Sequence, residues 1–456
     1  MNIKDIIEDQ QSFFKTNETK NISFRISQLK MIKKLLKENE EMLCDAIHKD
    51  FGKSAFETYT TELSMIYSEI DYSIKNIVKW SKRQSVPTGL TNFPAKSYII
   101  PEPLGTTLVI STWNYPFQLS FIPAIAALAA GNTVILKPSE LTTHSSAAMA
   151  KLINDHFPHH YFYVYEGGVQ ETTAALEHRF DKIFFTGSTE VGRIIYQAAA
   201  KHLTPVTLEL GGKCPTFVLA DCNIKVTAKR IIWSKYLNAG QTCIAPDYLL
   251  VDEAIHDPLL DALMNEIKKY HFEQTDISEN YSRIINTRHF DRLCQFINEG
   301  DVCFGGTMNR ANRFISPTIM KDITFDDDVM KDEIFGPILP IISYKNLDEV
   351  VKKVKDRPKP LACYIYSKNR QRIDQLLNEI SFGGGAINDS AMQMANIRLP
   401  FGGVGLSGMG SYHGKAGFDT FSHHKSILDK PFWFEPFVKY PPYTKTKKRI
   451  LKWLLE

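Results

Sequence analysis

The sequence has few cysteines, the residues that secreted proteins use in disulfides and that many zinc-binding proteins use as ligands. It holds seven cysteines in 456 residues, an odd number, and no two of them form a C-x-x-C pair. This scatter disfavours a disulfide framework and a zinc cluster, and it favours a reducing compartment. The histidines at 156, 159 and 160, and those at 423 and 424, have no carboxylate or cysteine at a spacing that completes a ligand set. We therefore expect surface histidines and no metal site.

The sequence also lacks a charge excess and a long apolar run. Lys and Arg total 54 against 51 Asp and Glu, a formal charge of +3, which predicts no affinity for nucleic acid or for bulk membrane. The longest apolar stretch, residues 121–136, is divided by Pro123 and Gly131 and is short for a membrane span. Residues 1–9 lack the apolar core of a signal peptide. We expect a cytoplasmic protein.

What is present is an ordinary globular composition, 43% hydrophobic and 23% charged, over a length that suits about three domains. Roughly the first 80 residues carry apolar side chains at helical spacing. Pro87 and Gly89 break this pattern, and an extended stretch follows at 96–101. Such a hairpin-like excursion is either an oligomerisation arm or a plain surface loop.

From residue 104 the pattern alternates between strands and helices, which predicts a doubly wound parallel sheet. The expected strands are 106–110, 132–136, 161–165 and 182–185, and the expected helices are 117–130, 143–155 and 190–200. A second series begins near residue 213, with strands at 215–219, 248–251, 339–342 and 362–366 and helices at 224–237, 256–270 and 370–379. Ligands of such sheets lie at the carboxyl ends of the strands.

One cysteine stands apart from the other six. Cys243 ends a loop of small and polar residues, 238–243, and Glu209 closes a short strand near the junction of the two series. A thiol and a carboxylate able to activate water can form and then hydrolyse a thioester. A buried cysteine and a solvated glutamate are the simpler explanations. The loop favours an exposed thiol whose thiolate is stabilised by backbone amides, and Leu208 and Leu210 favour a raised pKa for Glu209.

Two patterns in the first series indicate a dinucleotide. Gly187, Ser188 and Gly192 stand where a strand turns into a helix, whose free amides can hold a phosphate. The spacing G-x-x-x-x-G is weak on its own. Lys137 and Glu140 follow another strand of the same sheet and could contact ribose hydroxyls, although each pattern alone is also typical of a solvated loop. The two together favour a dinucleotide site.

Two further segments have both a functional and a simpler interpretation. Asn114 follows a strand and precedes a helix, so its amide could donate to an oxyanion, yet Asn before an aromatic residue and Pro is also a common turn former. Glu333 could bind a ribose and Phe335 could pack on a flat ring, or the segment 333–337 is simply a loop.

Taken together, these segments resemble the aldehyde dehydrogenase superfamily over nearly the full length of the chain. The matching segments, in family order, are Trp113-Asn114-Tyr115-Pro116, Lys137-Pro138-Ser139-Glu140, Phe185-Thr186-Gly187-Ser188, Leu208-Glu209-Leu210-Gly211-Gly212-Lys213, Gly240-Gln241-Thr242-Cys243, Glu333-Ile334-Phe335-Gly336-Pro337, Pro400-Phe401-Gly402-Gly403 and Ser407-Gly408-Met409-Gly410. Segments 412–415, 418–423 and 440–443 resemble the class 3 branch, which includes enzymes for fatty, aromatic and other apolar aldehydes.

The resemblance implies an α/β, aldehyde dehydrogenase-like fold with two doubly wound parallel-sheet domains and a β-hairpin oligomerisation arm. Its implied parts are an NAD(P)-binding domain at 1–81 and 102–209, a catalytic domain at 210–395, and the arm with the C-terminal segment at 82–101 and 396–456. It also implies a homodimer in which the arm is swapped onto the partner.

The same resemblance implies a role for each candidate residue. Cys243 matches the nucleophile, Glu209 the general base, and Asn114 with the Cys243 amide the oxyanion hole. The positions implied to contact the cofactor are Lys137 and Glu140 at the adenosine ribose, Gly187, Ser188 and Gly192 at the pyrophosphate, and Glu333 and Phe335 at the nicotinamide.

The implied reaction is the oxidation of an aldehyde to a carboxylic acid through a cysteine thioester. Acylating relatives that pass the thioester to coenzyme A generally lack the glutamate, so Glu209 favours hydrolysis. Glu140 should repel a ribose 2′-phosphate, which favours NAD, although class 3 members can accept NADP as well. The alternatives are a coenzyme A-acylating or reductive enzyme, and a non-catalytic binding protein on the same fold.

The tail from Phe432 onward is aromatic and ends in a basic segment, 445–456, that could form a short amphipathic helix. This helix could contact a membrane surface and so reach lipid-soluble aldehydes. Packing across a dimer or over the substrate tunnel is the favoured alternative, because the global charge is weak.

Overall fold

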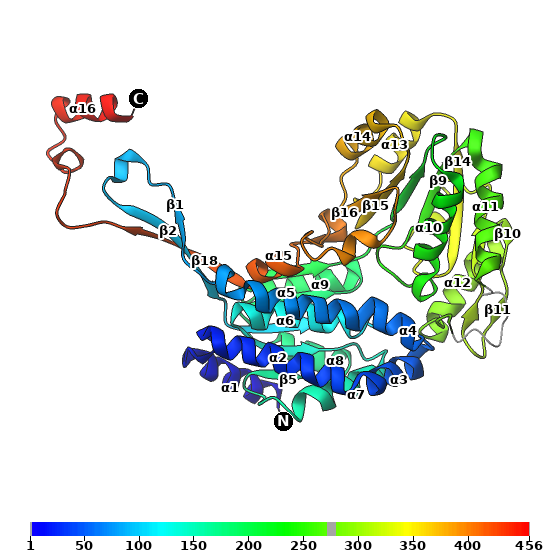
Figure 1. Ribbon diagram of the computed structural model, residues 1–456, viewed down its shortest axis with the longest axis horizontal. Coiled ribbons are helices and arrows are strands. Elements are labelled where there is room, and N and C mark those ends of the chain that lie inside the picture. The colour runs from blue at the N-terminus through cyan, green and yellow to red at the C-terminus, as the bar shows by residue number, and fades with distance from the viewer. Residues whose placement is uncertain (1, 271–279, 456) are drawn as a thin grey trace.

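The computed structural model describes residues 2–270 and 280–455. Its first 80 residues are helical, as expected, and they form a layer against the first sheet (Figure 1). The helices are α1 (Ile3–Lys15), α2 (Ile22–Glu38), α3 (Glu40–Phe51), α4 (Ala55–Thr58), the π-helix η2 (Tyr59–Leu63) and α5 (Ser64–Trp80). The π-helix η2 interrupts the α-helical turns between α4 and α5, and such a feature is frequent at functional sites.

The first sheet has the strand order β17-β7-β6-β3-β4-β5. Its parallel strands are β3 (Thr106–Ile110), β4 (Thr133–Lys137), β5 (Phe162–Val164), β6 (Lys182–Thr186) and β7 (Val206–Glu209), and β17 (Gly408–Met409) pairs antiparallel with β7. The connecting helices are α6 (Gln118–Ala130), α7 (Thr143–Asn154), α8 (Val169–Leu176) and α9 (Thr189–Ala200). All the expected strands and helices of this series are confirmed, whereas α8 was not predicted. Every residue of α6 is buried, which explains why the helix is almost wholly apolar after Ser120.

The second sheet has the order β10-β13-β14-β9-β8-β15-β16. Its strands are β8 (Pro215–Val218), β9 (Tyr248–Asp252), β10 (Val302–Phe304), β13 (Thr318–Met320), β14 (Ile338–Tyr344), β15 (Ala362–Tyr366) and β16 (Gly384–Ile387). The helices are α10 (Ile224–Tyr236), α11 (His256–Lys269), α12 (Thr287–Glu299), α13 (Leu347–Lys355) and α14 (Arg370–Glu379). The expected members are confirmed. The sequence did not predict α12, α13 or the glycine-containing strand β16.

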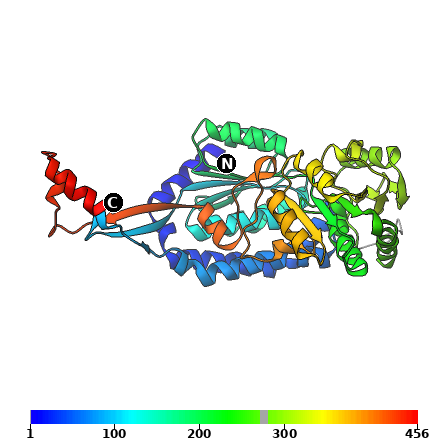
Figure 2. The same cartoon turned by 90° about the horizontal axis from the view of Figure 1, so that it is seen from above.

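The predicted hairpin is confirmed, and a third strand extends it. Strands β1 (Gln84–Val86) and β2 (Lys96–Pro103) pair antiparallel, and β18 (Ser422–Asp429) pairs along the whole length of β2. This arm projects away from both sheets, and the predicted basic helix α16 (Lys445–Leu455) lies at its outer end (Figures 1 and 2). Helix α16 therefore does not pack over the substrate tunnel of its own chain, which was one of the expected alternatives.

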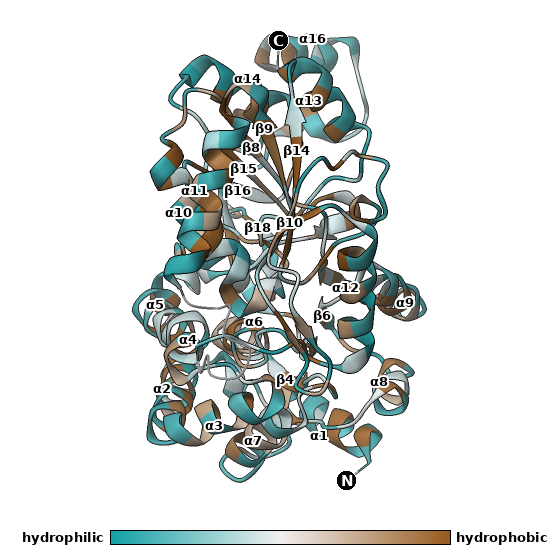
Figure 3. Ribbon diagram, turned by 90° about the vertical axis from the view of Figure 1, so that its right-hand side faces the viewer, coloured by the Kyte–Doolittle hydropathy of each residue, from teal (hydrophilic) through white to brown (hydrophobic). Residues whose placement is uncertain are grey.

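Figure 3 colours the ribbon by hydropathy, and the strands are largely in the brown of hydrophobic residues, which belong to the buried core together with residues of the packed helices. The central parallel strands β3, β4, β6, β8 and β15 are buried on both faces, so they lack the alternation of buried and exposed residues that marks a half-exposed strand. Within residues 2–270 and 280–455, no helix is both long enough and apolar enough to cross a membrane. Strand β7 of the first sheet leads through residues 210–214 directly into β8 of the second, so its carboxyl end lies at the junction of the two sheets.

Candidate active site

Glu209 ends strand β7 at that junction, level with Thr186 on the neighbouring strand. The residue is 2% exposed, and neither carboxylate oxygen has a partner among the described residues. Burial raises the pKa of Glu209 well above its usual value, as its apolar neighbours predicted. A buried acid with free oxygens and a raised pKa is a suitable proton acceptor for water.

Cys243 lies in a loop whose backbone is held in an uncommon conformation. Helix α10 ends at Tyr236, and Asn238 and Ala239 then take left-handed φ angles of 54° and 52°. Gly240 has a φ of 72°, and a Cβ there would overlap the carbonyl of Gly336. Only glycine therefore fits between the Cys243 loop and the loop that carries Glu333.

The thiol of Cys243 differs from our expectation in one respect. The backbone amides of Cys243 and Ile244 do contact it and lower its pKa, as predicted. The residue is half-buried rather than exposed, however, and burial together with the carboxylates of Glu333 and Glu209 raises the pKa of the thiol overall. The amides offset only part of the desolvation of the thiolate, because the loop packs against the second sheet.

Asn114 reaches the same loop from the first sheet. Its side-chain amide donates to the backbone carbonyl of Gln241 at 3.1 Å. The backbone carbonyl of Asn114 accepts from the side-chain amide of Asn238 at 2.8 Å. The next residue, Tyr115, shares a hydrogen bond of 2.7 Å with the hydroxyl of Thr242. The segment after β3 is thus joined to the residues just before Cys243, which the simple turn interpretation did not predict.

Glu333 closes the other side of the site. Its carboxylate lies against Gly211, where a Cβ would overlap it, and it accepts a hydrogen bond from the amide of Gly212. Burial, and then the charge of Asp247, raise the pKa of Glu333 to about 8. Phe335 has a φ of 51°, and its ring lies edge-on to Trp113 with centroids 5.3 Å apart.

A buried ion pair that we did not predict anchors the Glu333 loop. The ammonium of Lys213 lies 2.6 Å from the carboxylate of Asp247, which also accepts from the amide of Ile334 at 3.1 Å. Arg292 donates to the carbonyls of Glu333 and Ile334. Lys213 ends the segment 208–213 that resembles the family, but nothing in the sequence indicated that Asp247 is its partner.

The expected nucleotide residues lie along the carboxyl ends of the first sheet. Ser188 caps α9 by accepting from the amide of Val191 at 3.3 Å. A Cβ on Gly187 would lie 2.5 Å from the ring of Phe185, and one on Gly192 would lie 2.7 Å from Leu210, so strand and helix approach each other closely. The hydroxyl of Thr186 is buried without a partner among the described residues. This open helix start beside an orphaned hydroxyl fits a phosphate-bearing cofactor.

Lys137 and Glu140 lie further along the same edge, after β4. Lys137 is buried, and its ammonium donates to the carbonyls of Pro138 at 2.7 Å and Gly167 at 2.5 Å. Since an ammonium has three N–H groups, one remains for a ligand. Glu140 is exposed. Strand β3 separates this pair from the Gly187 turn, so the structure places the two patterns on one edge but not in contact.

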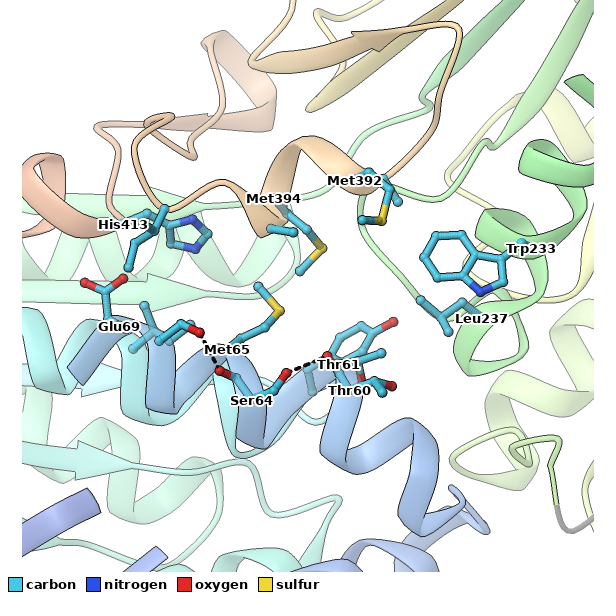
Figure 4. A pocket seen from close by; sticks show the side chains of 16 residues that line it. Thr60, Thr61, Ser64, Met65, Glu69, Trp233, Leu237, Met392, Met394 and His413 are labelled. Atoms are coloured by element: carbon cyan, nitrogen blue, oxygen red, sulfur yellow. Dashed lines mark hydrogen bonds between the residues drawn. The ribbon is translucent and has the colours of Figure 1, made fainter. Parts of the chain in front are cut away.

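An elongated cavity of about 330 Å³ adjoins the site (Figure 4). Its apolar walls include Met65, Ile122, Leu237, Met392, Met394 and Ile397. They come from α5, α6, the turn that follows α10, and the segment 392–397, which begins with the 3₁₀ turn η7 (Met392–Ala395). No motif marked these residues, because they come from distant segments and are ordinary apolar side chains in the sequence.

Glu69 and His413 lie at one end of the cavity, opposite Trp233 and Leu237 (Figure 4). Burial raises the pKa of Glu69 to about 8, against a lowering by the Gly414 amide, and burial lowers the pKa of His413 to about 4. Both side chains are therefore uncharged near pH 7, which suits an apolar ligand. Tyr115 also lines the cavity and, through Thr242, connects its wall to the nucleophile loop.

No group of three His, Cys, Asp or Glu side chains within residues 2–270 and 280–455 is arranged to hold a metal ion. What the site offers is a thiol, a buried carboxyl, amide donors and a helix start, at the junction of two doubly wound sheets. This combination is what an oxidoreductase that forms a covalent bond to its substrate and binds a dinucleotide would need.

Comparison with known proteins identifies the family. The family model for the aldehyde dehydrogenase family matches residues 1–427, and the chain belongs to this family. It is 47% identical over 446 residues to the 4,4′-diaponeurosporen-aldehyde dehydrogenase of Staphylococcus aureus, covering 97% of each chain. It is 43% identical over 442 residues to the dimeric NADP-preferring aldehyde dehydrogenase of Rattus norvegicus, covering 96% of this chain and 98% of that one.

The fold is likewise that of a solved relative. A structure described as the substrate-bound state of Staphylococcus aureus AldH superposes with a TM-score of 0.97 at 46% identity, over 100% of both chains. The chain is thus an aldehyde dehydrogenase, an oxidoreductase that acts on aldehydes with NAD(P) as the family's cofactor. The expected fold class and the expected enzyme class are both confirmed.

Proposed function

We propose that this chain oxidises an apolar aldehyde, whether fatty, aromatic or the end group of a terpenoid or carotenoid, to the carboxylic acid. The observation that carries the proposal is the cavity of about 330 Å³, whose walls are apolar and whose ionisable residues are uncharged near pH 7. The bond between Tyr115 and Thr242 joins that cavity to the nucleophile loop. The name of the Staphylococcus aureus relative, 4,4′-diaponeurosporen-aldehyde dehydrogenase, supports the same class.

In the proposed reaction the sulfur of Cys243 adds to the carbonyl carbon, and the carbonyl electron pair moves to oxygen. The side-chain amide of Asn114 and the backbone N–H of Cys243 then donate to that oxyanion. The amides of Cys243 and Ile244, which already contact the sulfur, stabilise the thiolate against the burial that raises its pKa. When bound, the nicotinamide would supply the hydride acceptor for the hydrogen on the aldehyde carbon, and the electron pair of the oxyanion would re-form the carbonyl to leave a thioester on Cys243.

Hydrolysis of the thioester needs a base, and we assign Glu209 to it. Its carboxylate accepts a proton from water, the resulting hydroxide attacks the carbonyl carbon, and the carbon–sulfur bond breaks to release the acid and the thiol of Cys243. Because neither oxygen of Glu209 has a partner among the described residues, both are free to accept from water. Its raised pKa makes the carboxylate a stronger base than an exposed glutamate.

We assign the remaining polar residues of the site to the cofactor. Lys137 and Glu140 would bind the adenosine ribose, Gly187, Ser188 and Gly192 would hold the pyrophosphate at the start of α9, and Glu333 and Phe335 would contact the nicotinamide end. The proximity of Glu333 and Glu209 to the thiol, through which both raise its pKa, supports a shared centre. We propose NAD as the preferred cofactor with NADP also accepted, since the exposed carboxylate of Glu140 would repel a 2′-phosphate.

We also propose a cytoplasmic homodimer joined through the arm. The strands β1, β2 and β18 form a small sheet that stands clear of the body (Figure 2). Large apolar side chains on and beyond it are exposed, including Leu90 at 83%, Phe93 at 59% and Phe432 at 105%. A second copy covering them is the simplest explanation, and the name of the dimeric rat relative supports it. Sedimentation of the full chain as a monomer would refute this part of the proposal.

The activity is tested by following reduced nicotinamide across aldehydes from short aliphatic to long-chain and aromatic, with NAD and with NADP. We expect kcat/KM to rise with the apolar length of the substrate and Cys243→Ser to abolish turnover. Cys294→Ser is the matched control, because Cys294 is also half-buried but lies on α12 outside the site. No turnover on any aldehyde, or turnover only with coenzyme A, would refute the proposal.

A further inference from the structure

The side chain of Asn238 bridges the two loops that carry the proposed oxyanion donor and the nucleophile. Its amide nitrogen donates to the carbonyl of Asn114 at 2.8 Å and to the carbonyl of Gln241 at 3.2 Å. The carbonyl of Gln241 also accepts from the side-chain amide of Asn114 at 3.1 Å. The three residues therefore form one closed set of hydrogen bonds, and one of them, Gln241, lies two positions before Cys243.

Asn238 itself is held in a single position. It is fully buried, with a φ of 54°, a left-handed angle that asparagine tolerates better than most residues. Its backbone N–H donates to the carboxylate of Glu57 at 2.7 Å, and the side-chain amide of Gln241 donates back to its carbonyl at 3.1 Å. The bridging amide has little freedom to move, because both the backbone and the side chain of Asn238 are fixed.

We propose that Asn238 is a positioning residue, which sets the separation between the amide of Asn114 and the sulfur of Cys243. The inference rests on the proposed function, in which both groups act on one carbonyl. An oxyanion donor acts only within about 2.7–3.1 Å of the developing charge, so a small shift between the two loops removes its effect. No other described side chain is seen to donate to the carbonyls of both Asn114 and Gln241.

A buried asparagine that only stabilises the fold is the alternative, and the chain supplies a matched control. Asn132 is also fully buried, and its amide donates to the carbonyls of Ala127 at 3.0 Å and Phe421 at 2.9 Å. It bridges distant backbone segments as Asn238 does, but it lies at the start of β4 away from the catalytic residues. Replacing either asparagine with aspartate keeps the side-chain size and removes the N–H donors.

The experiment compares Asn238→Asp, Asn132→Asp, Asn114→Ala and the double variant Asn238→Asp/Asn114→Ala in the full chain, with hexanal and NAD. We expect Asn238→Asp to lower kcat roughly 10- to 100-fold with the KM for NAD changed less than about threefold. We expect Asn132→Asp to lower the melting temperature comparably but kcat by less than about threefold. If Asn238→Asp is insoluble, Asn238→Gly serves instead, because glycine accepts the positive φ.

The double variant separates positioning from general loss of structure. If Asn238 acts through Asn114, its substitution in the Asn114→Ala background should lower kcat by less than about twofold further. Equal losses in both backgrounds, or an unchanged kcat for Asn238→Asp, would overturn the inference while leaving the proposed function intact. An unchanged kcat for Asn114→Ala would instead refute the oxyanion role itself, and the inference with it.

Discussion

The buried ion pair between Lys53 and Glu62 allows the most direct test of the energetics behind the site. Both side chains are 0% exposed, and the ammonium lies 2.7 Å from one carboxylate oxygen. The other oxygen accepts from the amides of Phe117 at 2.8 Å and Gln118 at 3.2 Å. The ammonium also lies 4.0 Å from the ring centre of Tyr115. The pair thus contacts the segment after β3, residues 115–118, which follows Asn114 directly.

Lys53→Met removes one charge and keeps the length of the side chain. Breaking a buried pair in this way generally costs about 3–5 kcal/mol, because the remaining charge is left without its partner in a poorly solvated place. Glu62 keeps its two amide donors, so we expect a loss near the lower limit, about 3 kcal/mol. The double variant Lys53→Met/Glu62→Gln should lose less than the single one, since no buried charge remains.

The assay is urea unfolding of the full chain, followed by tryptophan fluorescence and circular dichroism. Lys49→Met is the control: its pair with Asp45 is similarly short, at 2.6 Å, but the two side chains are 55% and 59% exposed, and we expect a change below about 1 kcal/mol. A loss for Lys53→Met no larger than that of the control would refute the reasoning. So would a double variant less stable than the single one.

Three further predictions concern the cavity and the cofactor. Burial raises the pKa of Glu69 from 4.5 to about 8. Between these two values the folded chain holds a proton that the unfolded chain releases. The free energy of unfolding should therefore fall, as the pH rises from about 5 to about 8, by up to about 1.4 kcal/mol per pH unit. Glu69→Gln should remove that slope in denaturant unfolding, and an unchanged slope would contradict the account. Leu237→Trp, which narrows the cavity, should lower kcat/KM for decanal at least about tenfold but spare propanal, whereas Leu399→Trp on the surface should change neither. Glu140→Gln should raise kcat/KM for NADP relative to NAD, and a constant ratio would show that this carboxylate does not select the cofactor.

The sequence was sufficient to predict the two doubly wound sheets and the placement of Glu209 and Cys243 near their junction. Strands buried on both faces leave unbroken apolar runs, and the turns after them carry glycines that the close packing requires, as at Gly187 and Gly240. Glu209 could be assigned to the end of a strand and Cys243 to a loop because both stand beside such glycines. The raised pKa of Glu209 followed from its apolar neighbours alone.

Features that depend on distant segments could not be predicted. Strand β18 is polar and half-exposed, and it is a strand because β2, some 320 positions earlier, pairs with it. The cavity walls come from α5, α6, α10 and η7, each of which contributes a few ordinary apolar residues. The raised pKa of the Cys243 thiol arises from burial and from Glu333, which lies 90 positions further along the chain. The local sequence indicated only the backbone amides of the Cys243 loop, which lower the pKa of the thiol.

The central claim is that Cys243 forms a thioester that Glu209 hydrolyses, and trapping that thioester tests it directly. Glu209→Gln should be mixed with NAD and hexanal, and the release of reduced nicotinamide and the mass of the peptide containing Cys243 should be measured together. We expect a burst of about one equivalent per site, slow turnover thereafter, and a hexanoyl mass on Cys243 that is absent from Cys243→Ser. Steady turnover at the rate of the unmodified chain, or a burst without acyl mass on Cys243, would contradict the account.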